Sequence, residues 1–182
     1  MINKSAAVIG RQTDFTIDEL RRFTIEQKSK NHKPIEENEG KLYHIKKELA
    51  LIVEGLEQIG LTDIAMNKIS TQWTELRDIL MHETQPKDLI IFTGEKIQNH
   101  IHTLGIAEKI KRIREETDIV MIGDYDWQNY DKVNRDLFMK KPFTIKDFKG
   151  RILNLLLQRN DFNPLEKLKI RLWLEKIRLG LG

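Results

Sequence analysis

Short, unbroken apolar runs alternate along the chain with segments whose apolar residues recur every three or four positions. The clearest run is at residues 89–92, where four apolar residues follow a polar turn and stop close to Gly94. A run this short and continuous is typical of a strand buried on both faces, as in the middle of a parallel sheet. Ligands bind beyond the carboxyl ends of such strands, so Thr93 is the first candidate for function.

The same alternation extends over most of the chain. Short apolar runs predict strands at residues 42–45, 64–66, 89–92, 119–122 and 137–139. Helical spacing or capping residues predict helices at residues 49–59, 71–80, 106–116 and 144–156. Strands that alternate with helices of this length predict an α/β fold, in which helices cover both faces of a parallel sheet through right-handed crossovers.

Residues 1–40 are predicted to form an N-terminal extension. Thr16 and Glu19 have the spacing of a capping box, and the apolar residues Ile17, Leu20 and Phe23 then recur at helical spacing. Residues 29–40 are rich in lysine, asparagine and glutamate, which predicts a linker. The main domain is therefore expected at residues 41–160.

Residues 161–182 are predicted to form a basic amphipathic helix of their own. Asn163, Pro164 and Glu166 are suitable residues for a helix start. The apolar stripe that follows consists of Leu165, Leu168, Leu172, Trp173 and Ile177, with lysine and arginine on its flanks. Such a stripe has to be covered, and four candidates are open: this protein's own core, a partner helix, a second copy of the chain, and an anionic membrane surface.

Composition narrows the classes of function. The chain has 182 residues, 40% of them apolar, which is enough to bury the core of one domain. Its 31 basic and 28 acidic side chains leave a net charge of +3, which gives little support to nucleic-acid binding. The absence of cysteine excludes disulfides and thiolate catalysis, and it fits a reducing, cytoplasmic compartment.

Membrane and metal chemistry are not expected either. The first residues contain only a short apolar patch, and no run approaches the roughly 18 apolar residues of a membrane-spanning helix. His100 and His102 lie two positions apart, with no nearby acidic residue to complete a metal site. We therefore predict no metal ion and no cofactor. Peripheral contact with a membrane stays open as an alternative for the C-terminal helix.

The order of the predicted elements resembles the receiver domain of bacterial two-component response regulators, over about residues 41–160. The local matches are residues 88–92 as the third strand, residues 110–115 as the end of the third helix, and Lys141-Pro142-Phe143 before an amphipathic helix. The resemblance implies a flavodoxin-like (βα)5 fold, a doubly wound parallel sheet of five strands, here with helical extensions at both ends.

Several positions depart from that family. The resemblance implies a phosphorylated aspartate at the end of the third strand, an acidic magnesium-binding pair after the first and a threonine or serine after the fourth. The matching positions here are Thr93, the pair Lys46 and Lys47, and Gly123, and only Lys141 agrees with the pattern. Ammonium groups repel magnesium, and a threonine hydroxyl without an adjacent base is a poor phosphoryl acceptor. The chain is therefore expected to be a pseudo-receiver and not an enzyme.

Three functions follow as hypotheses. The first is a regulatory module that binds another protein or a second copy, independently of phosphorylation. The second is an anion or nucleotide sensor, in which the lysines at 46, 47 and 141 converge on one pocket unless Glu48, Glu95 or Asp124 neutralises them. The third is a regulator that binds nucleic acid through the basic terminal helix.

Overall fold

The computed structural model describes residues 4–10, 14–29, 40–68, 88–93, 117–123 and 138–181. Within these ranges the strands are β1 (Ser5–Gly10), β2 (Asp63–Lys68), β3 (Leu89–Thr93), β4 (Asp118–Gly123) and β5 (Phe138–Lys140). The helices are α1 (Ile17–Ser29), α2 (Lys41–Gln58), α5 (Ile145–Gln158) and α6 (Pro164–Arg178). All five strands are parallel and form one sheet in the order β2-β1-β3-β4-β5. The α/β class and the parallel sheet are thus confirmed.

The first strand differs from the prediction. Residues 42–45 lie inside helix α2, so the strand predicted there is wrong. The first strand is instead β1, which lies between β2 and β3, and residues 5–10 therefore belong to the sheet rather than to an extension. Its run Ala6–Ile9 ends at Gly10 and is fully buried, which is the same pattern that correctly predicted β3.

The other described elements agree with the prediction. Strands β2, β3, β4 and β5 lie within two residues of their predicted positions. Reciprocal hydrogen bonds between side chain and backbone open three helices, through the pairs Thr16–Glu19, Thr144–Asp147 and Asn163–Glu166. The predicted helices at 71–80 and 106–116 and most of the predicted linker at 29–40 lie outside the described residues.

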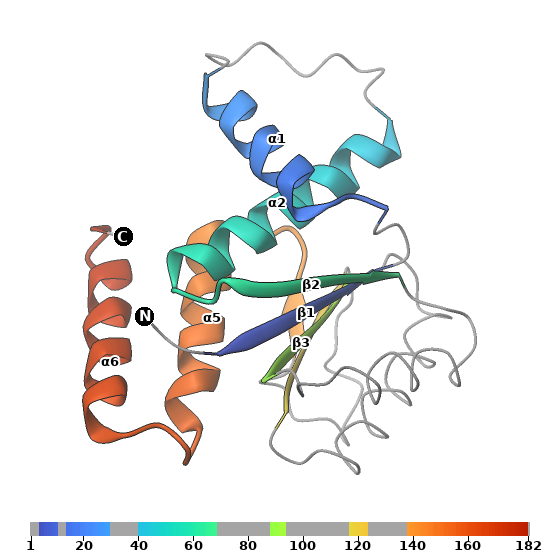
Figure 1. Cartoon of the computed structure of the whole chain (residues 1–182). Helices are drawn as coiled ribbons and strands as arrows, with labels where there is room; N and C mark the ends of the chain where they lie inside the picture. Colours follow the sequence, from blue (N-terminus) through green and yellow to red (C-terminus); the bar gives the residue numbers. More distant parts are fainter. Residues whose placement is uncertain are drawn as a thin grey trace.

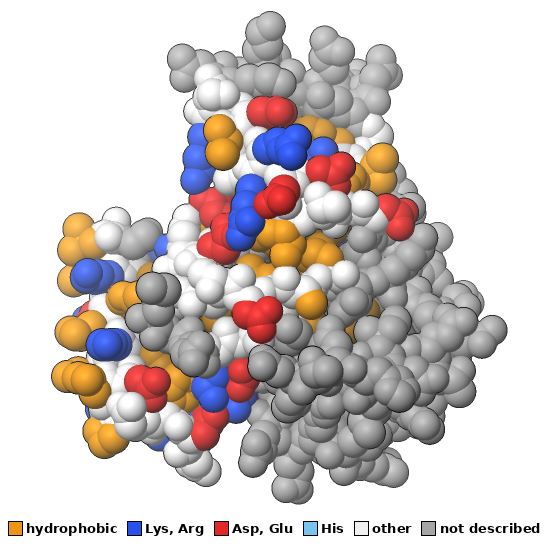
Figure 2. Space-filling view, viewed as in Figure 1, with side chains coloured by type: hydrophobic (Ala, Val, Ile, Leu, Met, Phe, Trp, Pro, Cys, Tyr) orange, Lys and Arg blue, Asp and Glu red, His pale blue; other side chains and the backbone are white. Residues whose placement is uncertain are grey.

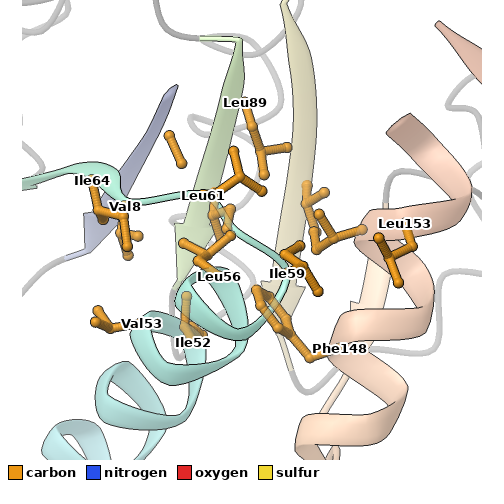
Figure 3. Packing of buried hydrophobic residues seen from close by; sticks show 14 of the residues in the cluster. Val8, Ile52, Val53, Leu56, Ile59, Leu61, Ile64, Leu89, Phe148 and Leu153 are labelled. Atoms are coloured by element: carbon orange, nitrogen blue, oxygen red, sulfur yellow. The ribbon is translucent and has the colours of Figure 1, made fainter. Parts of the chain in front are cut away.

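Helices α2 and α5 cover one face of the sheet (Figure 1). The side chains of that face and of the two helices form one buried cluster, which includes Val8, Leu89, Ile52, Leu56 and Phe148 (Figure 3). The alternate residues of the central strands, such as Ile9, Ile90 and Met121, are buried as well. The central strands are therefore buried on both faces, as their unbroken apolar runs predict.

The remaining helices pack outside this layer. Helix α1 contacts α2 through the rings of Phe23 and Tyr43, whose centroids are 5.4 Å apart, and through an ion pair of Arg21 with Glu57. Helix α6 packs against α5, and its residues Ile170 and Ile177 are buried. The described helices thus form two pairs, α1 with α2 and α5 with α6 (Figure 1).

The contact of α2 with α5 depends on a glycine. A Cβ atom on Gly55 would lie 2.5 Å from Cδ1 of Phe148, a ring that is fully buried and therefore has little room to move. We predict that Gly55→Ala lowers the free energy of unfolding. Overpacking costs roughly 1–3 kcal/mol, which outweighs the roughly 0.5–1 kcal/mol that alanine gains over glycine inside a helix.

Gly150 of α5 is the matched control, because a Cβ atom there would meet nothing within 4 Å. Gly150→Ala should raise the free energy of unfolding by up to about 1 kcal/mol. Urea denaturation of both variants measures the two changes, and changes of the same sign would contradict the close packing of Gly55 on Phe148.

Candidate functional site

The carboxyl edge of the sheet is the first candidate site. The register of the parallel strands places Gly10, Thr93, Gly123 and Lys140 at this edge, each as the last residue of its strand. The side chain of Thr93 is buried. The backbone N–H of Lys141 donates to the carbonyl of Gly123 at 2.9 Å. Three of the predicted site residues, Thr93, Gly123 and Lys141, therefore lie at or next to the ends of adjacent strands.

Lys141 has an acidic partner at this edge. Its Nζ lies 2.6 Å from Oε2 of Glu48, a residue of α2, and both side chains are mostly buried. The first half of α2 therefore reaches the end of β5, and the charge of Lys141 is neutralised. Of the two interpretations drawn from the sequence, the neutralised lysine agrees with this contact.

Lys46 and Lys47 do not have the position that the resemblance assigned to them. Both are in helix α2 and not in a turn after the first strand. The Nζ of Lys46 lies 5.2 Å from the ring centroid of Phe15 and 5.4 Å from that of Phe23, so it interacts with aromatic faces. Lys47 is exposed. These contacts give no support to an anion pocket formed by three converging lysines.

Because β1 is the first strand along the chain, the resemblance would place the magnesium-binding pair directly after β1. In sequence, Arg11, Gln12 and Thr13 follow Gly10 and lie outside the described residues; Asp14 comes next. The sequence still has no acidic pair directly after the first strand. Within the described part of the chain no group of three histidine, aspartate or glutamate side chains is placed to hold a metal ion.

Among the described residues, the densest cluster of charge lies at the opposite, amino edge of the sheet. The side chain of Arg159 is 9% exposed, and its guanidinium donates two hydrogen bonds of 2.9 Å to the carboxylate of Asp161. It also contacts Asp118 at 3.2 Å and both the carbonyl and the carboxylate of Asp88. Lys4 bridges Asp88 and Asp161. We call these five residues the Arg159 cluster.

Hydrogen bonds and neighbouring charge shift the ionisation of the Arg159 cluster. The hydrogen bond from Arg159 lowers the pKa of Asp161 well below its ordinary value. Burial acts to lower the pKa of Lys4, but its hydrogen bonds to Asp161 and Asp88 outweigh burial and raise that pKa. The pKa of Arg159 is raised as well, chiefly by its hydrogen bond to Asp161. The pKa shifts of Lys4, Arg159 and Asp161 all favour the charged form, so we assign the cluster a structural role.

The outer surface of α6 is the third candidate. Its apolar residues divide between two sides of the helix. Ile170 and Ile177 are buried against the core, and Trp173 and Leu174 are half-buried beside them. The outward leucines are Leu165 (62% exposed), Leu168 (51%), Leu172 (55%) and, at the C-cap, Leu179 (65%). We call these four residues the leucine stripe; Figure 2 shows hydrophobic and basic side chains along the outer side of α6.

The predicted partner-binding set is divided between the core and the surface. Trp173 packs against the core and Ile177 is buried in it, whereas Leu165, Leu168 and Leu172 are exposed. Leu179 was absent from the predicted set. Its position seven residues after Leu172 on the same side of the helix is the signal that identifies it.

Comparison with known proteins finds no matching family model, no matching curated protein and no matching solved structure. No described helix combines the length and the apolar character that crossing a membrane requires. Function is therefore argued from the chemistry of the three candidate sites.

The lowered pKa of Asp161 predicts how the stability of the folded protein depends on acidic pH. A carboxylate whose pKa is lower in the folded state contributes stability above its unfolded pKa, about 3.9, and loses that contribution as the pH falls. Wild type should therefore be more stable than Asp161→Asn above about pH 5, and the difference should shrink towards pH 2. Urea denaturation across this pH range measures it.

Asp18→Asn is the control for this experiment. Asp18 forms one exposed ion pair, with Arg21 at 3.0 Å, and pairs of that kind contribute about 0–1 kcal/mol. A pH-dependent loss as large in Asp18→Asn as in Asp161→Asn would contradict a special role for the Arg159 cluster.

Proposed function

We propose that the protein is a non-catalytic, receiver-like regulatory module that acts by binding another protein. The observation that carries this proposal is the leucine stripe. A helix whose buried side already packs on the core has no need of exposed leucines on its opposite side for folding. Exposed apolar surface of this kind marks interaction sites.

The receiver-like part of the proposal is supported by the sheet. The strand order β2-β1-β3-β4-β5 is that of flavodoxin-like doubly wound folds. Thr93 ends the third strand, where the resemblance implies an aspartate, and Lys141 follows the fifth, where the family has a lysine. Two helices, α1 and α2, lie between β1 and β2, where simple βα alternation has one. Because the first strand was predicted inside α2, the metal-ligand positions were predicted at Lys46 and Lys47 instead of after β1.

The non-catalytic part is supported by the chemistry of the carboxyl edge. A buried threonine hydroxyl is a weak nucleophile unless a base is adjacent, and Lys141, next to the end of β5, is neutralised by Glu48. The anion-sensor hypothesis requires three converging lysines. The contacts of Lys46 and Lys141 therefore favour protein binding over anion sensing.

We predict that the protein takes up no phosphoryl group from acetyl phosphate in the presence of magnesium. The reason is that Thr93 occupies the position of the acceptor carboxylate and no acidic pair follows β1. Intact-mass spectrometry after incubation measures any uptake. A stoichiometric gain of one phosphate that disappears in Thr93→Ala would overturn the non-catalytic proposal.

Protein binding at the leucine stripe is tested by photo-crosslinking. A photoreactive amino acid at position 168 should form an adduct with another protein in cells that express the chain naturally. The matched control is position 25 on α1, because Ile25 is also an exposed apolar helical residue, at 66% exposure. Mass spectrometry identifies the adducts. The absence of an adduct at 168, or the same adducts at both positions, would contradict the proposed binding site.

A further inference from the structure

The leucine stripe has the spacing of a coiled-coil seam. Leu165, Leu168, Leu172 and Leu179 follow one another at intervals of three, four and seven residues. At about 100° per residue, the four leucines fall within a sector of about 60° around the helix axis. This is the narrow a/d pattern of helices that pair with one other helix, in contrast to the apolar face of about 100° or more that covers a core.

The stripe is held in place before any partner binds. Ile170 and Ile177 anchor the opposite side of α6, and the capping box of Asn163 and Glu166 fixes its first turn. The turn before α6 contains Arg159 and Asp161, which tie it to the sheet. A preformed helix loses little conformational entropy on binding, so even a seam of about two heptads can serve as a docking surface.

The charged side chains that flank the stripe are all basic. Lys169 and Lys176 flank it on one side, and Arg171 and Arg178 on the other, and all four side chains are exposed. Glu175 occupies the seam position between Leu172 and Leu179 and contacts Arg178 at 3.4 Å. The flanking positions, which decide partner choice in paired helices, thus carry positive charge on both sides.

This arrangement disfavours a second copy of the chain. In a parallel pair the two flanks of the seam face each other, and in an antiparallel pair each flank faces its own equivalent. Both arrangements would bring lysine or arginine against lysine or arginine, and such like-charge contacts destabilise the pair. A helix with acidic flanks would instead form ion pairs along both sides of the seam.

A membrane surface fits less well. Helices that lie in the lipid interface have a broad apolar face of tryptophan, phenylalanine or leucine. The apolar stripe here is narrow, Trp173 packs towards the core, and Glu175 within the stripe would be repelled by anionic lipid. The narrow seam and its cationic flanks therefore select a protein helix.

We infer that the outer face of α6 binds an acidic amphipathic helix of a partner protein, whose apolar residues pack against the leucine stripe and whose glutamate or aspartate side chains meet Lys169, Arg171, Lys176 and Arg178. This inference rests on the proposed function, because it specifies the partner of the same site.

The test uses the full-length protein and two synthetic peptides of four heptads. Both carry leucine at the seam positions; one has glutamate at the flanking positions and the other has lysine. Fluorescence anisotropy measures their affinities. The glutamate peptide should bind at least about tenfold more tightly than the lysine peptide, and its affinity should fall as salt is raised, because charge pairs supply the discrimination.

Two variants locate the binding. Leu168→Asp together with Leu172→Asp should reduce the affinity for the glutamate peptide at least about tenfold, since charges would replace the seam. Lys169→Glu together with Arg171→Glu should move the preference towards the lysine peptide. The substituted side chains are exposed, and an unchanged melting temperature verifies that the fold is intact.

Three results would overturn the inference. Equal binding of the two peptides would show that the basic flanks do not select an acidic partner. Dimerisation of wild type in sedimentation, lost in the double leucine variant, would assign the stripe to a second copy. Binding to phosphatidylserine vesicles, lost in the same variant, would assign it to a membrane. If the glutamate peptide fails while the adduct at position 168 persists, only the acidic-helix inference fails and the proposed function stands.

Discussion

The rest of the described structure depends on the burial of one guanidinium, that of Arg159. A charge this far from water is stable only when its hydrogen bonds are all satisfied, and removing one partner of such a group typically costs about 3–5 kcal/mol. Its partners come from three places: Asp88 before β3, Asp118 at the start of β4, and Asp161 in the turn before α6. One side chain therefore joins the amino edge of the sheet to the C-terminal helix pair. Because this joint orients α6, it also decides which side of that helix meets solvent.

Charge serves structure at both edges of the sheet. At the amino edge the Arg159 cluster holds the strand ends together, and at the carboxyl edge Glu48 neutralises Lys141. The carboxyl edge is where an α/β sheet usually carries its chemistry, and here its described residues include a buried hydroxyl, the paired Lys141 and the exposed Lys140. Among the described residues, large exposed apolar side chains are Ile25 on α1, Leu42 on α2, Leu181 and the four leucines of the stripe, and only the stripe repeats along one side of a helix. The exposed stripe thus supports the proposal that the protein acts by binding another protein.

Sequence reasoning succeeded where a local signal was strong. Capping pairs located the starts of α1, α5 and α6, because these hydrogen bonds involve residues only three positions apart. Unbroken apolar runs located β3 and β4, because a strand buried on both faces has no room for polar residues. It failed at β1 and at residues 42–45. A run with two alanines is a weak strand signal, and Tyr43 and Ile45 favour strands locally although they pack as part of a helix. The misplaced first strand also displaced Lys46 and Lys47 from their predicted site.

At the C-terminal helix, the sequence determined some features and the tertiary structure decided others. The sequence by itself determined that α6 is a helix, where it begins, and that it carries leucine, tryptophan and isoleucine between basic residues. Only the tertiary structure decided that Ile170, Trp173 and Ile177 face α5 and the core while the leucine stripe faces solvent. The physical reason is that α6 has apolar residues on two nearly opposite sides. Helical periodicity identifies both sides, but the choice of the covered side depends on distant contacts, namely the packing of α5 and the Arg159 cluster.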